Sequence, residues 1–221
     1  MVRTVVFIYD IVQNFVMLAS FIVSLFKIKK ILANKYLRLF PFYTLVSLVV
    51  DSTFYFNKPF GTLEVNLFVV FEFVIFYIFY WNVLDDRKNH RILIGLIVIY
   101  LVLCQVIILL YFKTYNLSLK KLLEKRTFVE FMAMDNIFLV IPIIFYFKSL
   151  FSLPMKKLSH DSIFLVMSGI LFGFSLMIPT DAIYILIKQD KISIFFYSYI
   201  LNSLGYIFMH LLIIKAYLSL K

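Results

Sequence analysis

The stretch from residue 64 to residue 84, EVNLFVVFEFVIFYIFYWNVL, constrains most strongly what this chain can fold into. It is an apolar run with one carboxylate, Glu72, set inside it. About 20 apolar residues at a rise of 1.5 Å each cross the hydrocarbon core of a bilayer, so the run predicts a membrane-spanning helix. Because lipid offers Glu72 no water, its side chain must face a protein interior, a partner or a cavity.

The composition of the whole chain agrees with a membrane protein. Hydrophobic residues make up 63% of it and charged residues 15%, whereas a soluble domain carries roughly 25% charged residues. A net charge of +10 would suggest nucleic acid in a soluble protein. Here most Lys and Arg lie in short loops between apolar runs, where membrane insertion and anionic headgroups explain them better. We therefore expect membrane lipids as partners, a membrane or signalling protein as a further candidate, and no nucleic acid.

The apolar runs predict an all-α, polytopic membrane protein with seven transmembrane helices in a single domain, residues 1–221. The first run is longer than the core of a cleaved signal peptide, so it is interpreted as a span. The connections are short and leave no room for a soluble domain. The predicted spans are residues 5–26, 37–56, 65–84, 92–112, 127–147, 163–187 and 193–218.

The distribution of Lys and Arg predicts the orientation. The larger share of the 22 basic residues falls on the side that carries the first connection and the C-terminal end, which places the N-terminus outside and the C-terminus inside. We expect a multi-pass protein of the cell inner membrane. The basic connection between spans four and five argues against this orientation. Its segment 117–126, LSLKKLLEKR, fits either an amphipathic helix lying in the headgroups or a solvated basic loop.

Acidic residues inside the spans form the predicted site. Because successive helices alternate in direction, all of them fall in the same half of the bilayer, within ~15 Å of one surface. No Lys or Arg lies at comparable depth, so some acids are protonated, or water fills a vestibule, or a cation occupies it. The acids are Asp10, Asp51, Glu72, Glu130, Asp135 and Asp181.

Other polar residues extend this predicted site. Asn14 is one turn from Asp10, and two stripes at a spacing of three or four residues mark interior faces of spans two and seven. The first stripe, at a spacing of four, is Tyr43, Ser47, Asp51 and Tyr55, and the second, at a spacing of three or four, is Tyr199, Asn202, Tyr206 and His210. The predicted ligand-binding residues are Asp10, Asn14, Asp51, Glu72, Asp135, Asp181 and Asn202. The predicted relay residues are Pro179, Tyr206 and His210.

Structural interpretations stand beside these functional ones. The carboxyls fit a structural hydrogen-bond network as well as a binding site. For His210 we expect an interhelical hydrogen bond rather than a proton relay. Gly169 and Gly173 have the GxxxG spacing of closely packed helices, here within the bundle. Tyr80 and Trp81 fit an aromatic belt at the membrane surface.

Several kinds of chemistry are excluded by the sequence. It contains no Walker loop, GxGxxG, GxSxG, HExxH or CxxC motif. Of the three histidines only His210 falls in a span, so a three-histidine zinc site cannot assemble in the bundle. Lys215 ends the last span, which argues against a retinal Schiff base. We expect no metal and no cofactor.

Short segments along most of the chain resemble a group of uncharacterised seven-helix membrane proteins of Bacteroidota. They are LVSLVVD (45–51), NLFVVFEF (66–73), RTFVEF (126–131), SGILFGFS (168–175) and YSYILNS (197–203). Members of that group tend to carry a His and a second Asn on helix seven, where this chain has Ser198 and Tyr206. The resemblance implies a seven-helix fold and a membrane location, with no established activity.

The sequence leaves four functional hypotheses. The first is a non-enzymatic sensor or signalling accessory whose outer-half acidic pocket binds a proton, a cation or a small cationic ligand. The second is a membrane-embedded hydrolase that uses paired acids as general acid and base on a lipid. The third is a small transporter, for which paired broken helices would be the sign. The fourth is a structural subunit of a larger membrane complex.

Overall fold

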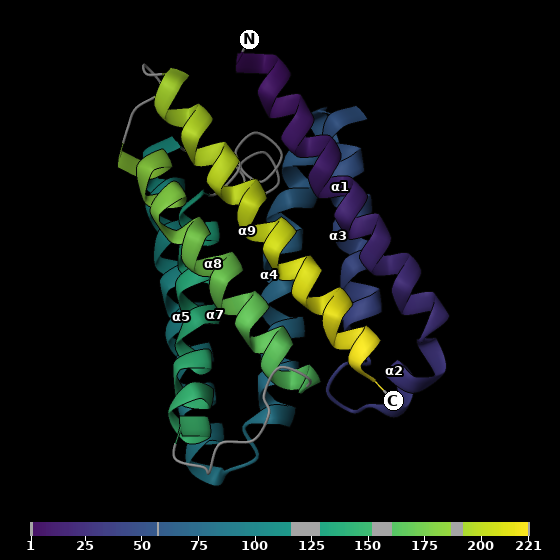
Figure 1. The fold of residues 1–221 in the computed structure, drawn as a ribbon. Coiled ribbons are helices and arrows are strands. Elements are labelled where there is room, and N and C mark those ends of the chain that lie inside the picture. Colours follow the sequence, from purple (N-terminus) through teal and green to yellow (C-terminus); the bar gives the residue numbers. More distant parts are fainter. Residues whose placement is uncertain (1, 57, 116–128, 152–160, 187–191, 221) are drawn as a thin grey trace.

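The prediction of an all-α chain is confirmed by the computed structural model (Figure 1), in which every described element is a helix. The structure describes residues 2–56, 58–115, 129–151, 161–186 and 192–220. The helices are α1 (Val2–Phe26), α2 (Ile28–Ala33), α3 (Phe40–Phe56), α4 (Lys58–Val83), α5 (Arg87–Tyr115), α7 (Val129–Phe151), α8 (Ser162–Leu186) and α9 (Ile192–Ser219). The predicted segment 117–126 and His160 lie outside the described residues.

Six of the described helices are long and apolar enough to cross a membrane, which agrees with a membrane-spanning protein. They fall within α1, α4, α5, α7, α8 and α9, each at a predicted span. The remaining predicted span, 37–56, overlaps α3. This helix begins at Phe40 and is apolar over the shorter stretch Phe40–Ser52. The short helix α2 was not expected, because its six residues fall in a connection between two spans.

The helices form one bundle in which neighbours in space are not always neighbours in sequence. The α9 helix packs against α8 and against α1, and the α1 and α9 helices cross the front of the bundle in Figure 1. The α3 helix packs against α4 and α1, while α7 packs against α8, α4 and α5. The α5 helix lies at the edge of the bundle (Figure 1), where its main neighbour is α7. This arrangement brings α4, α7 and α8, which carry four of the six predicted acids, into consecutive contact.

The centre of the bundle is aromatic. The fully buried ring of Phe40 on α3 meets Phe76 and Phe79 of α4 edge-on, with ring centroids 5.8 Å and 5.0 Å away. Phe76 in turn meets Phe174 of α8 at 5.4 Å. Edge-to-face pairs of this kind stabilise by about 1 kcal/mol beyond the area they bury. They fix α3, α4 and α8 around the polar residues described below.

Glycines allow α8 and α9 to pack at close range. A Cβ placed on Gly205 would lie 2.7 Å from the carbonyl oxygen of Gly173, and one placed on Gly169 would lie 3.1 Å from the carbonyl oxygen of Met209. Any side chain at these positions would push the two backbones apart. The expectation that Gly169 and Gly173 serve packing inside the bundle is therefore confirmed.

A proline inside α7, Pro142, explains the buried hydroxyl of Tyr77 on α4. Proline has no N–H, so the carbonyl of Phe138, four residues earlier, loses its helical partner. Tyr77 donates a hydrogen bond to that carbonyl at 3.2 Å, and Tyr80 donates one to the next carbonyl, that of Leu139, at 2.8 Å. A neighbouring side chain, that of Tyr77, thus satisfies the carbonyl that the proline frees.

This arrangement corrects the aromatic-belt prediction for Tyr80. Its side chain is fully buried in the core, because its hydroxyl is needed at α7. Trp81 does lie at the surface, where its indole stacks on the ring of His90 with centroids 3.9 Å apart. The two adjacent aromatic residues therefore point to opposite environments.

Candidate functional site

Three buried carboxyl side chains lie on α4, α7 and α8, where α7 packs between the other two helices. Glu72, Asp135 and Asp181 are 3%, 1% and 2% exposed. They come from three different helices, and they are close enough that Asp135 is subject to repulsion from both of the others. We refer to these three residues as the carboxyl cluster. The prediction that Glu72, Asp135 and Asp181 face the interior is confirmed.

The members of the carboxyl cluster differ in their hydrogen bonds. Glu72 accepts one from the hydroxyl of Tyr43 on α3, at 2.6 Å. Asp181 accepts one from the side-chain amide of Asn136 on α7. Both oxygens of Asp135 are buried, and neither has a hydrogen-bond partner within the described part of the chain. A buried polar atom without a partner costs about 1–3 kcal/mol, and more when it is charged, so Asp135 is the least stabilised group of the cluster.

No positive side chain compensates these carboxyls among the residues that the structure describes. The buried charged residues there are acids, and the described Lys and Arg side chains lie toward the surface. The donors that reach the carboxyl cluster, Tyr43 and Asn136, are neutral. Neutral donors stabilise a carboxylate without cancelling its charge, so the repulsion between the three groups is left in place.

His210 lies next to this site, on α9. Its ring is fully buried and stacks on the ring of Tyr43, with centroids 6.1 Å apart and planes 7° from parallel. Neither ring nitrogen has a hydrogen-bond partner among the residues that the structure describes. The expectation that His210 makes an interhelical hydrogen bond is therefore wrong. The imidazole is held by stacking, and through Tyr43 it is linked to Glu72.

Asn202 and Tyr206 of the predicted α9 stripe also lie toward the interior. Tyr206 is partly buried and interacts electrostatically with Glu72, Asp135 and Asp181, and with Asp51. The side-chain oxygen of Asn202 is buried and has no hydrogen-bond partner among the described residues. The α9 helix therefore turns a polar face toward the bundle interior, as its spacing of three or four residues predicts.

The remaining predicted ligand-binding residues form a second group, between α1 and α3. The side chain of Asn14 donates to the main-chain carbonyl of Asp10 at 3.1 Å and also hydrogen-bonds Asp51. Asp10 is buried and Asp51 is partly exposed, and the two carboxyls repel each other. The predicted site thus divides into two groups, with Tyr206 close enough to interact with both.

Two further residues of the sequence analysis, Pro179 and Glu130, lie away from the carboxyl cluster. Pro179, a predicted relay residue, is exposed on α8, while the next two residues, Thr180 and Asp181, are buried. Glu130 accepts a hydrogen bond from the hydroxyl of Tyr111 on α5. Glu130 thus joins α7 to the peripheral helix at a different contact from that of the carboxyl cluster.

Asn136 is the site residue that sequence reasoning missed. It is 5% exposed and holds the carboxyl of Asp181. The signal was present, since Asn136 is an amide beside Asp135 in an otherwise apolar run. Across the described ranges, no group of three or more His, Cys, Asp or Glu side chains is placed so that it could hold a metal ion.

The comparisons with known proteins gave no match. No family model, no curated protein and no solved structure matches the chain. The functional argument therefore depends on the geometry of the site.

Proposed function

We propose that this chain is a multi-pass protein of the inner membrane that binds a proton or a small monovalent cation at the carboxyl cluster, and that it acts as a sensor or signalling accessory rather than as an enzyme. In this proposal α3 is a seventh span, the N-terminus lies outside and the C-terminus inside. The observation that carries the proposal is the side chain of Asp135, which is 1% exposed and has no hydrogen-bond partner for either oxygen in the described ranges.

The proton or cation binds at Asp135, because the other two carboxyls of the cluster already have hydrogen-bond donors. Tyr43 donates a hydrogen bond to Glu72, and Asn136 donates one to Asp181, so each of these carboxyls has a donor. An ionised Asp135 would carry an uncompensated charge in a low-dielectric interior, beside two groups that repel it. A proton or a cation removes that charge. The cluster therefore has two states whose stabilities differ, which a sensor needs.

The packing around the cluster supports a path by which occupancy reaches the other end of the bundle. Asp135 and Asp181 lie on α7 and α8, which pack against each other, and α8 packs against α9 at glycine contacts with no free space. A change in repulsion between α7 and α8 would shift α8 against α9. Tyr206 and His210 lie on the α9 face beside the cluster. This path refines the predicted relay by replacing Pro179 with the helix contact itself.

The test is to measure carboxyl protonation directly in the purified full chain. Infrared difference spectroscopy distinguishes a protonated carboxyl from a carboxylate by its C=O stretching band. We expect a carboxyl band that changes when pH or sodium concentration is changed, and that is absent in Asp135→Asn. The matched control is Glu130→Gln, on the same helix, which should keep the band because Glu130 belongs to the contact with Tyr111.

A band that persists unchanged in Asp135→Asn, in protein that remains folded by thermal unfolding, would contradict the proposal. Glu72→Gln and Asp181→Asn then show whether another member of the cluster binds instead. The hydrolase, transporter and structural-subunit hypotheses, and the resemblance to the Bacteroidota group, stay predictions.

A further inference from the structure

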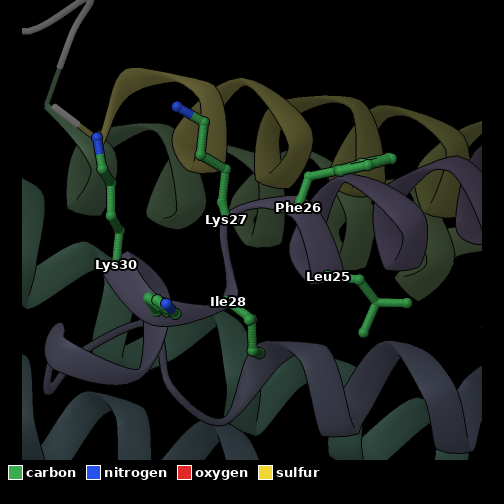
Figure 2. Close-up of a pocket in the computed structure, with 6 residues that line it drawn as sticks. Leu25, Phe26, Lys27, Ile28 and Lys30 are labelled. Atoms are coloured by element: carbon green, nitrogen blue, oxygen red, sulfur yellow. The ribbon is translucent and has the colours of Figure 1, made fainter.

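At the opposite end of α1 from Asp10, the chain turns sharply into α2 and leaves a hollow of about 340 Å³. Its lining is the continuous segment Leu25–Lys30, so apolar residues and lysines share one small surface. Figure 2 shows the side chains of Lys27 and Lys30 extending in the same direction from this turn. We refer to the segment 25–30 as the elbow.

The elbow is fixed at both ends of α2. Ile31 is fully buried and so is Leu37, just beyond the helix. The amides of Lys30 and Ile31 both donate to the carbonyl of Lys27, at 2.9 Å and 3.0 Å. The side chain of Asn34 then accepts from the amide of Tyr36 at 2.9 Å. The lysines of the elbow therefore lie on a turn whose backbone is held by hydrogen bonds.

The charge of the elbow is not neutralised within the described part of the chain. The segment 27–38 contains five basic residues and no acid. Lys35, outside the hollow, rests over the ring of Tyr36 at 4.8 Å. For Lys27, Lys29 and Lys30 no ion pair is present among the described residues. Three clustered cations without a counter-charge attract an anion.

The apolar residues of the elbow indicate what kind of anion binds there. Phe26 and Leu25, the last residues of the apolar helix α1, are 86% and 51% exposed. An apolar surface beside lysines, at the end of a membrane-spanning helix, matches the boundary between acyl chains and headgroups. A free anion in water would gain nothing from Phe26 and Leu25. A phospholipid would contact both parts of the surface.

We propose that the elbow binds the headgroup of an anionic phospholipid, with its phosphate at Lys27, Lys29 and Lys30 and its upper acyl chain against Leu25 and Phe26. Polybasic segments beside a membrane helix attract anionic lipid by additive contributions from each Lys or Arg. The elbow adds to that general attraction a hollow and an apolar wall. This proposal is independent of the carboxyl cluster.

The experiment measures the binding of fluorescent phosphatidylglycerol and of phosphatidylcholine with the same acyl chains to the full-length protein in neutral detergent micelles. We expect the protein to prefer phosphatidylglycerol. The triple variant Lys27→Gln, Lys29→Gln, Lys30→Gln should lose that preference on the order of a hundredfold, as expected for three cations near a headgroup. The triple variant with Arg at these positions should retain it.

The matched control removes three exposed cations from the start of α5: Arg87→Gln, Lys88→Gln, Arg91→Gln. It lowers the net charge equally and should change the preference by less than about threefold, a small part of what three cations contribute at a headgroup. An equal loss in both triple variants would overturn the proposal, since only overall charge would then matter. So would an undiminished preference in the elbow variant.

Two further measurements keep the proposal testable. If the triple elbow variant does not fold, the single change Lys30→Gln, at an exposed position, should lower the preference about fivefold, and no loss would overturn the proposal. Inorganic phosphate is added as competitor to the wild type. Failure to displace the lipid supports a lipid site, and full displacement would overturn it in favour of a site for free phosphate.

Discussion

The α4 and α5 helices follow one another in the sequence, yet they occupy opposite environments. The α5 span is the more hydrophobic, with a mean hydropathy of 3.1 against 1.6 for α4. Nevertheless 11% of the α5 span is buried, compared with 50% of the α4 span. The buried side chains of α4 are mostly Phe and Tyr, with Glu72 and Asn66 among them, whereas α5 exposes Ile, Leu and Val.

The comparison shows that hydrophobicity does not identify the interior of this bundle. Lipid is as apolar as leucine, so an aliphatic helix gains little by burial in protein. Groups with a polar atom do gain, because only protein can supply their hydrogen bonds. Tyr43, Tyr77 and Tyr80 each make such a bond inside the bundle. The interior is therefore where hydroxyls, amides and carboxyls find partners, and α5 marks the perimeter.

The largest effect should come from adding one methyl group at an interior glycine. In Gly205→Ala the new Cβ lies 2.7 Å from the carbonyl oxygen of Gly173, so two backbones must move. We expect the free energy of unfolding to fall by about 3 kcal/mol, the upper range for overpacking, as measured by denaturation of the full chain in micelles.

The matched control is Gly95→Ala on α5. A Cβ at Gly95 meets nothing within 4 Å, and alanine is the better helix former by about 1 kcal/mol. The two identical changes should therefore shift stability in opposite directions. Destabilisation of similar size at both positions would show that α5 is packed as tightly as α9.

A smaller effect should follow from removing the hydroxyl that serves Glu72. Tyr43→Phe keeps the ring and its stacking on His210 but leaves a carboxyl oxygen of Glu72 without its donor. Hydrogen bonds to charged groups contribute about 1.5–3 kcal/mol, so we expect a loss of about 2 kcal/mol in the same assay.

The corresponding change at the perimeter is Tyr111→Phe on α5, which removes the donor to Glu130. Both residues are partly exposed there, so water or headgroups can replace the lost hydroxyl and the cost should be below about 1 kcal/mol. A cost at Tyr111 that equals the cost at Tyr43 would remove the distinction between interior and perimeter.

The same distinction explains how far the sequence could predict the structure. Spans are set by length and hydropathy, so each long helix was located, including its acids. Whether a polar side chain is buried depends on its hydrogen-bond partners in neighbouring helices, which a single sequence does not show. For this reason the sequence predicts a surface position for Tyr80, which is buried, and a hydrogen bond for His210, which has none among the described residues. It does not indicate that Asn136 holds Asp181. Pro142 is the available signal for Tyr77, because a proline within a span frees one carbonyl that needs a donor from a neighbouring helix.

The smallest effect, and the most specific one, concerns that proline. Tyr77→Phe removes the donor to the carbonyl of Phe138 and should cost about 1 kcal/mol, since the acceptor is a neutral carbonyl and the bond is 3.2 Å long. Pro142→Ala returns an N–H to the position that would bond the same carbonyl.

In the Pro142→Ala background, Tyr77→Phe should therefore have little effect on the free energy of unfolding. The double-mutant cycle isolates this coupling from any general effect of either substitution. Tyr80→Phe provides the comparison, because its acceptor, the carbonyl of Leu139, faces the N–H of Ile143 and does not depend on residue 142. Equal coupling of Pro142 to both tyrosines would indicate that the proline acts by tilting α7 as a whole. Coupling to Tyr77 alone would show that a hydroxyl of α4 replaces one missing backbone donor of α7, as the contrast between interior and perimeter requires.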